Sequence, residues 1–260
     1  MTTHLIAWQE SIDQATLGRI TTVQDDVLTP DGTDRFLVPD EYNFIRWMFA
    51  TGTDLTRATI NAPSLAVSRS NLNIAPRQDG DNSLSLTAPQ VMIPVRPIEL
   101  TPTESVEAQT AEDGSGAKQT NVVVALSTAE LAPMPDGQIR AVRATATVSA
   151  VVAFTWAAVT MTLESSLEPG RYSLVHFLPS SPGAIACRAL PQGGGFRPGM
   201  PGLKGTETTA QDFDPSIYNQ LGWYDMLEFT HITVPQFQFF TSATDTSFTI
   251  YLYVIRTGDL

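Results

Sequence analysis

The chain has 260 residues, of which 42% are hydrophobic and 16% are charged, and its formal net charge is −12. This length and hydrophobic content exclude a wholly disordered protein and suffice for one large β-sandwich or two small ones. Neither end carries the clustered cations that phosphate binding needs, so we expect no direct contact with nucleic acid. The low charge density suits extensive contact with other proteins, because interface cores are depleted in charge, and it equally suits an extracellular β-domain.

The first half of the chain contains several expected strands and two weaker helix signals. His4–Gln14 has apolar residues at helix-like intervals, which is consistent with a short terminal helix or a docking arm. Pro39–Phe49 could begin as a helical turn, but its aromatic and β-branched residues favour a strand. The expected strands in this half are Leu17–Val23, Phe36–Val38, Asn43–Ala50, Leu55–Asn61, Val91–Ile98 and Val106–Gln109.

The second half contains the clearest β pattern of the chain. Between Ile139 and Ser149 apolar residues alternate with Arg, Thr and Ser, and between Phe154 and Leu163 they alternate largely with Thr. A period near two predicts half-buried antiparallel strands rather than a helix. The expected strands here are Val122–Leu126, Ile139–Ser149, Ala153–Leu163, Tyr172–Phe177, Ala184–Leu190, Trp223–Thr233, Phe237–Phe240 and Ser247–Arg256.

The spacing of strands and turns predicts the fold class. With 17 Gly and 18 Pro in the loops and no long segment of helical period, we expect an all-β protein built as an antiparallel jelly-roll β-sandwich. The most linker-like segment runs from Glu112 to Lys118, near the midpoint. It favours two tandem jelly rolls, residues 1–112 and 119–260. The alternative is one sandwich of 260 residues in which this segment is a hairpin loop.

The chain contains no compact catalytic signature. His4, His176 and His231 do not have the spacing of a zinc motif, and His176 alternates with apolar residues as a packed strand residue would. Cys187 lies in an apolar strand pattern, which predicts a buried thiol rather than a nucleophile. A nucleophile elbow, a P-loop and a dinucleotide fingerprint are all missing from the sequence. We therefore expect neither an enzyme nor a bound cofactor.

An acidic loop is the one weak metal candidate. Its carboxylates are the oxygen ligands that calcium prefers, but their spacing is not that of an EF-hand, and a solvated acidic turn is the favoured interpretation. The candidate calcium ligands are Asp25, Asp26, Asp31 and Asp34.

A Gly/Pro-rich loop, residues 192–214, is the candidate contact between subunits. Its repeated Pro-Gly pattern restricts the backbone and lowers the entropy lost on docking. Arg197 would supply a charged anchor, and Phe196 and Met200 would supply apolar contact. Because Lys118 and Lys204 are the only lysines, most cations are arginines, which suit partly buried pairs. We expect a self-assembling homo-oligomer, most simply a trimer.

These features together resemble the jelly-roll coat proteins of viruses, in particular the double jelly-roll subunits of tailless, membrane-containing icosahedral phages. The resemblance lies in the chain length, the tandem Thr-rich strand sets, the long Gly/Pro loops and the lack of a signal peptide or a catalytic motif. It implies a capsid subunit that assembles in the host cytoplasm into an icosahedral shell with other virion proteins. Without a basic arm, the inner face of such a subunit would meet a membrane or a more basic protein.

The rival function is a carbohydrate-binding module of a spike or tail. Both functions are compatible with the same fold, so the fold cannot separate them. All four tryptophans, Trp8, Trp47, Trp156 and Trp223, lie in apolar segments and are expected in the core. A carbohydrate platform would instead expose Trp8 or Trp223 beside acidic or amide groups.

Overall fold

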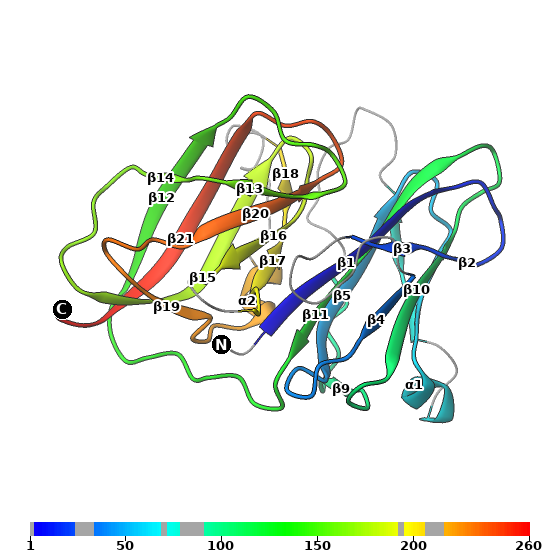
Figure 1. The fold of residues 1–260 in the computed structure, drawn as a ribbon, viewed down its shortest axis with the longest axis horizontal. Helices are drawn as coiled ribbons and strands as arrows, with labels where there is room; N and C mark the ends of the chain where they lie inside the picture. Colours follow the sequence, from blue (N-terminus) through cyan, green and yellow to red (C-terminus); the bar gives the residue numbers. More distant parts are fainter. Residues whose placement is uncertain (1–2, 24–33, 69–71, 79–90, 192–194, 206–215) are drawn as a thin grey trace. The chain divides into compact units, whose positions relative to one another are not determined.

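The computed structural model describes residues 3–23, 34–68, 72–78, 91–191, 195–205 and 216–260 (Figure 1). Nearly all of its regular structure is β-strand, and the sheets are predominantly antiparallel, which confirms the expected all-β class. The described helices are short, α1 (Pro63–Ser68) and α2 (Ser216–Leu221). None of the helices in these ranges is long and apolar enough to span a membrane.

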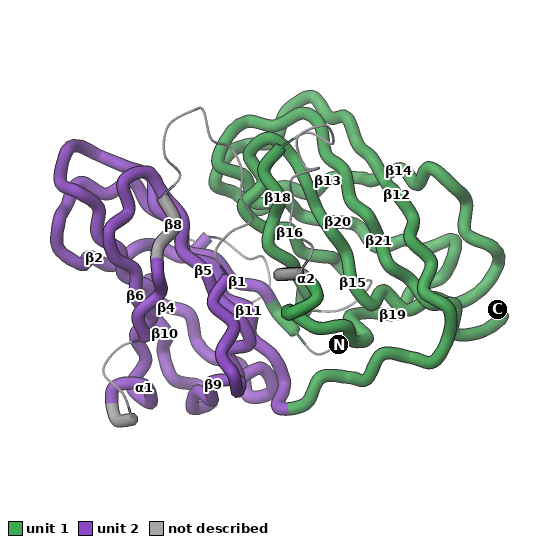
Figure 2. The backbone as a smooth tube through the Cα atoms, turned by 180° about the vertical axis from the view of Figure 1, so that it is seen from behind, with its two compact units in different colours: residues 1–4, 86–88, 130–260 green, residues 5–85, 89–129 purple. Residues whose placement is uncertain are grey.

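The chain divides into two compact units (Figure 2). Unit 1 contains the first residues as far as His4 and the segment Glu130–Leu260, and unit 2 contains the described residues between Leu5 and Ala129. The division therefore falls between Ala129 and Glu130, and residues 113–117 form the turn between two strands inside unit 2.

Unit 2 consists of two sheets. The larger has the order β3-β1-β11-β5-β8, with β9 also paired to β5, and the smaller has the order β2-β10-β6-β7, with β4 also paired to β10. The bounds are β1 (Thr3–Ile12), β2 (Gly18–Arg19), β3 (Thr21–Thr22), β4 (Arg35–Leu37), β5 (Phe44–Gly52), β6 (Arg57–Asn61), β7 (Leu72–Ile74), β8 (Pro76–Gln78), β9 (Ile98–Glu99), β10 (Ser105–Ala111) and β11 (Lys118–Ser127).

Unit 1 also consists of two sheets. The larger has the order β14-β12-β21-β15-β18, with β19 also paired to β15, and the smaller has the order β13-β20-β16-β17. The bounds are β12 (Ile139–Thr147), β13 (Trp156–Val159), β14 (Thr162–Leu163), β15 (Arg171–Ser181), β16 (Ala184–Leu190), β17 (Gly199–Pro201), β18 (Leu203–Lys204), β19 (Leu227–Thr230), β20 (Gln236–Thr241) and β21 (Ser247–Gly258).

The two units repeat the same pairing scheme. Read in chain order, β1 to β3 of unit 2 correspond to β12 to β14 of unit 1, and β5 to β11 correspond to β15 to β21. Only β4 lacks a counterpart among the described strands. The repeat extends to strand direction: β5 pairs with β8 in parallel and with β9 antiparallel, as β15 does with β18 and β19. Two tandem jelly rolls were expected from the linker-like segment, but the shared order of pairing is visible only in the structure, because pairing order can recur where residues do not.

Inside each unit the inner faces of the two sheets are in contact. In unit 1 the rings of Phe177 and Phe237, from different sheets, lie 5.3 Å apart, and those of Phe239 and Phe248 lie 4.6 Å apart. In unit 2 the ring of Trp8 in the larger sheet meets that of Phe36 in the smaller at 6.5 Å. Burial of these large side chains between the sheets is the main source of stability in each unit.

Two local predictions were wrong. The segment His4–Gln14, expected as a short helix or a docking arm, lies in strand β1 as far as Ile12, and the first residues of this strand are buried on both faces. Burial on both faces removes the alternation that identifies a strand in a sequence. The expected strand Val91–Ile98 is reduced to a single bridge at Met92 and the short β9, because Pro94 and Pro97 have no N–H to donate to a ladder.

The assignment of the unit 1 core can be tested by truncating one of its buried aromatic side chains. Phe239 has no exposed surface, so we expect Phe239→Ala to lower the free energy of unfolding by about 3–5 kcal/mol through lost burial and the resulting cavity. Urea unfolding followed by circular dichroism measures this. The control is Ile232→Ala at a side chain that is 75% exposed, where the change should stay within about 0.5 kcal/mol. Equal effects of the two substitutions would contradict the assigned core.

Candidate functional site

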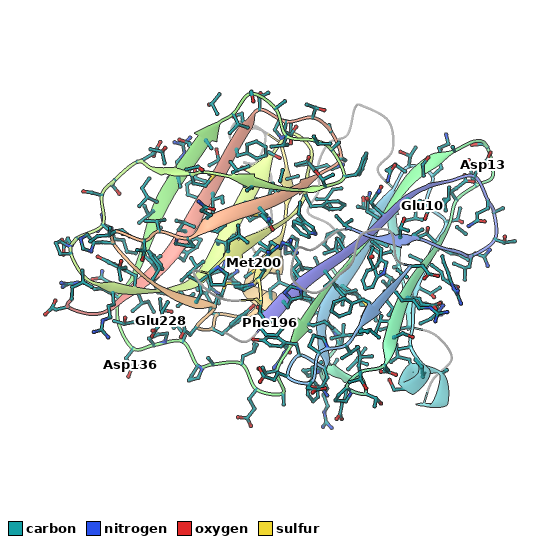
Figure 3. All side chains as sticks on the ribbon, in the orientation of Figure 1. Glu10, Asp13, Asp136, Phe196, Met200 and Glu228 are labelled. Carbon is teal, nitrogen blue, oxygen red and sulfur yellow. The ribbon has the colours of Figure 1, made fainter. Side chains whose placement is uncertain are left out.

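Of the three residues proposed as an interface, Phe196 and Arg197 lie on the segment that leads into β17, and Met200 lies in β17 itself. Figure 3 labels Phe196 and Met200. Met200 is opposite Cys187 in the β16–β17 ladder and has no exposed surface. Arg197 is 7% exposed, and Phe196 is half-buried with its ring edge against His4, 5.8 Å between centroids. Residues 192–194 and 206–214 of the proposed loop lie outside the described residues.

Arg197 belongs to a buried cluster of two arginines on the small sheet of unit 1. Arg188, in β16, has no exposed surface, and its Nε donates to Gln238 Oε1 at 2.7 Å. Nη1 of Arg197 donates to the same oxygen at 3.1 Å. Gln238 faces Arg188 across the β16–β20 ladder, so the register brings the amide to the guanidinium. One neutral amide oxygen thus binds two cations inside the protein.

Aromatic rings complete this cluster. The guanidinium carbon of Arg188 lies 4.1 Å from the centroid of the Trp156 ring, a distance at which the ring face attracts the cation. The backbone N–H of Arg197 donates to Nδ1 of His4 at 3.0 Å, which requires that this nitrogen be unprotonated. Trp156 is half-buried, so the cation–π contact is shielded from water on part of its surface.

The interface residues therefore make contacts within unit 1. Arg197 and Met200 are buried, and Phe196 packs on His4 of the same unit. A contact between subunits at this segment stays a prediction. Replacing Phe196 and Arg197 together by Ala would also remove internal contacts, so a loss of assembly in that variant would not by itself identify an interface.

The calcium candidates are only partly described. Asp25, Asp26 and Asp31 lie outside the described residues. Asp34 is paired with cations: its Oδ2 lies 3.2 Å from Nη1 of Arg19, and its Oδ1 lies 3.8 Å from Nε of Arg35. Both arginines also pair with Glu107, at 2.8 and 3.0 Å. Two guanidinium groups beside one carboxylate disfavour a bound cation.

The remaining candidates among the described residues are possible metal ligands and the thiol of Cys187. Across the described ranges, no three side chains of His, Cys, Asp or Glu are grouped so that they could hold a metal ion. Cys187 is fully buried, as the sequence predicted, and burial raises the pKa of its thiol well above the usual value. A thiol of this kind stays protonated near neutral pH and is a poor nucleophile.

The tryptophans separate into two groups. Trp8 and Trp47 lie in the core, at 0% and 2% exposure, whereas Trp156 and Trp223 are half-buried. The Trp223 ring packs on His176 and Tyr253, with centroids 4.7 and 5.2 Å apart. Burial also raises the pKa of Tyr253. The expected packing role of His176, which is 1% exposed, is confirmed by these contacts.

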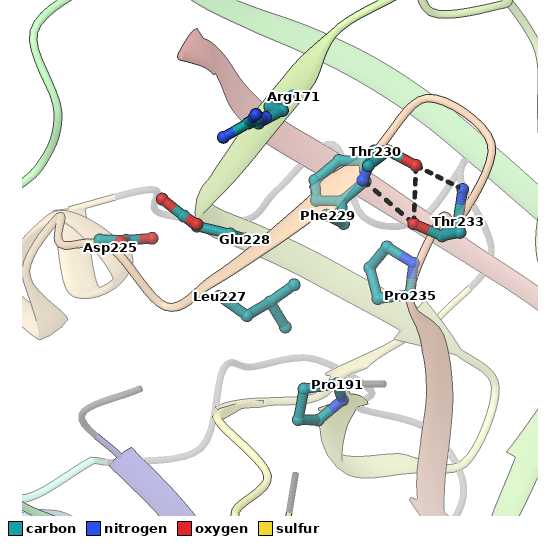
Figure 4. A pocket seen from close by; sticks show the side chains of 9 residues that line it. All are labelled: Arg171, Pro191, Asp225, Leu227, Glu228, Phe229, Thr230, Thr233 and Pro235. Atoms are coloured by element: carbon teal, nitrogen blue, oxygen red, sulfur yellow. Dashed lines mark hydrogen bonds between the residues drawn. The ribbon is translucent and has the colours of Figure 1, made fainter. Parts of the chain in front are cut away.

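A pocket of about 460 Å³ lies along β19, the edge strand of the larger sheet of unit 1 (Figure 4). Arg171, Asp225 and Glu228 stand on one side of it, and the hydrogen-bonded pair Thr230 and Thr233 stands on the other. Pro191, Leu227, Phe229 and Pro235 complete the lining. Sequence reasoning missed this pocket, because its residues come from three separate segments.

The chemistry of this pocket is limited. Ser173 donates its hydroxyl to Oδ1 of Asp225 at 2.7 Å, and the described lining residues include no His or Cys that could act as base or nucleophile. A Ser–Asp contact without a histidine does not activate the serine. The described lining offers charged groups of both signs together with apolar side chains.

Comparison with known proteins gives a weak likeness. No family model and no curated protein matches the chain. Among solved structures, the chain is similar to the major capsid protein P2 from bacteriophage PM2, with a TM-score of 0.23 and 9% sequence identity, over 98% of this chain and 99% of that one. A score of this size does not establish a common fold, and the proposals below rest on the chain's own geometry.

The arginine cluster predicts a large effect for one amide. Gln238→Leu removes the acceptor of two buried charge-assisted hydrogen bonds, so we expect the free energy of unfolding to fall by about 2–5 kcal/mol. The matched control is Gln236→Leu, an exposed glutamine on the same strand, which should change it little. Urea unfolding of both variants makes the comparison, and a Gln238→Leu protein as stable as the control would show that the cluster does not depend on this amide.

Proposed function

We propose that each unit is a jelly roll and that the chain is a double jelly-roll capsid subunit of a virus. In a jelly roll the first strand of the unit pairs with the last, and the second pairs with the next to last. Strands β12 and β21, and β13 and β20, are paired in this way in unit 1, as are β1 and β11, and β2 and β10, in unit 2.

The observation that carries this proposal is the repeat of one pairing scheme within a single chain. Jelly rolls form the walls of many viral capsids, and closed shells are built from many copies of similar units in symmetric contact. A chain that contains the scheme twice contributes two similar building blocks per subunit. The charged fraction of 16% adds support, since large contact areas favour surfaces with few charges.

The subunit would assemble with itself and with other virion proteins, and a trimer is the simplest closed ring. Three chains would present six similar units around one axis. The net charge of −12 disfavours contact with packaged nucleic acid, so the inner face of the shell would meet another protein or, through one, an internal membrane. Such a protein would be found in the virion after assembly in the host cytoplasm.

The alternative function, a carbohydrate-binding spike or tail module, predicted an exposed Trp8 or Trp223. Trp8 is fully buried against Phe36 and is not available to a ligand. Trp223 is half-buried, its indole N–H donates to Oδ1 of Asn219 at 3.2 Å, and its ring packs on His176. These tryptophans therefore favour the capsid over the spike module.

The oligomeric state tests the proposed function. For purified protein at micromolar concentration, we expect light scattering to give a mass at least three times the 28.2 kDa of one chain, and negative-stain electron microscopy to show rings or shells. The assembly should respond weakly to salt, because contacts poor in charge are little screened. A single species of 28.2 kDa over the whole concentration range would contradict the proposal.

A further inference from the structure

A row of hydroxyl groups crosses the larger sheet of unit 1 on its outer face. Thr145 of β12 lies opposite Thr249 of β21, and Thr249 lies opposite Ser180 of β15. Opposed residues in neighbouring strands project from the same face with Cβ atoms about 5 Å apart. The inner face carries the neighbouring residues Ala144, Phe248 and Ile250, which belong to the buried core.

These hydroxyls line a pocket of about 380 Å³. Such a volume lies within the range of about 300–1,000 Å³ found for small-molecule sites. The lining is rich in hydroxyl groups and includes a single charged residue, Arg143. Its members are Arg143, Thr145, Ala146, Thr147, Ser180, Ser181, Pro182, Gly205, Ser247, Phe248 and Thr249.

Two hydroxyls in this pocket belong to mostly buried residues but are themselves open to the pocket. Ser180 is 6% exposed and Thr249 is 8% exposed, and neither side chain forms a hydrogen bond with another residue of the described chain. A hydroxyl that opens into a pocket and has no partner among the described residues can bind a polar ligand.

The charge around the pocket selects a neutral ligand. Arg143 forms an ion pair with Glu164, whose carboxylate neutralises the guanidinium. A phosphate or sulfate would have to compete with this carboxylate for the guanidinium of Arg143. The hydroxyls of a polyhydroxyl ligand can instead accept from the guanidinium and donate to the carboxylate. Tyr251 lies opposite Arg143 on the same face and is 38% exposed, so a ring with an apolar face borders the polar row.

We propose that this pocket binds one or two residues of a neutral saccharide chain. Thr249 and Ser180 would bind sugar hydroxyls, Arg143 and Glu164 would bind a neighbouring pair of hydroxyls, and Tyr251 would pack on the C–H face of the ring. The proposal does not depend on the capsid function and uses no tryptophan. As part of a capsid, the site would be a contact to a surface glycan.

Binding is tested with soluble saccharides on the full-length protein. Lactose, maltotriose and diacetylchitobiose serve as probes in saturation-transfer NMR and calorimetric titration, and inorganic phosphate serves as the charged competitor. We expect at least one saccharide to bind and phosphate not to displace it. Absence of binding by all three saccharides, or displacement by phosphate, would overturn the proposal.

Single substitutions test whether the saccharide binds on this face of the sheet. Thr249→Val keeps the shape of the side chain and removes the hydroxyl, so it should weaken binding about three- to tenfold, the worth of one hydrogen bond. Tyr251→Ala, at an exposed position, should weaken it at least as much. Thr257→Val, an exposed position near the other end of β21, is the matched control and should leave binding unchanged. Unaltered affinity in both pocket variants, with thermal unfolding showing all three to be folded, would overturn the assignment.

Discussion

In each unit the last strand lies between two strands that come much earlier in the sequence. This pairing holds the larger sheet together. Strand β21 pairs with β12 on one side and β15 on the other, and β11 lies between β1 and β5 in the same way. Neither larger sheet can be completed until its final strand is in place. Such long-range pairing has a high loop-closure cost, so we expect both units to fold slowly for their size.

The long pairings also determine which side chains meet. The β16–β20 register brings Gln238 opposite Arg188, and the segment before β17 adds Arg197 to the same amide oxygen. The β12–β21–β15 register brings Thr145, Thr249 and Ser180 into one row. The buried arginine cluster and the hydroxyl pocket therefore follow from strand order, although their residues are far apart in the sequence.

The sequence predicted what depends on local pattern. Alternation between Ile139 and Ser149 correctly indicated strand β12, and the apolar neighbours of Cys187 correctly indicated a buried thiol. Where a strand is buried on both faces, as in the first residues of β1, the pattern disappears and the helix signal was misleading. Prolines at 94 and 97 shortened another expected strand.

What depends on distant pairing was not predictable from one sequence. The Gly/Pro-rich loop predicted Arg197 as a charged anchor for contact between subunits. The sequence did not show that its acceptor, Gln238, lies on β20, in another part of the chain. Two tandem units were expected, but the strand order that they share was hidden for the same reason. A polar residue inside an apolar strand, such as Arg188 or Gln238, was the available signal, since burial of such a group requires a partner.

The central claim is that the chain contains two units with the same strand order. Cross-strand nuclear Overhauser effects in the deuterated protein test it most directly, because they report which backbone atoms are neighbours. The account predicts contacts of Thr249 with both Thr145 and Ser180 in unit 1, and of Asn121 with Thr51 in unit 2. Pairing of β21 with only one of its two neighbours, or a single sheet joining strands of both units, would contradict it.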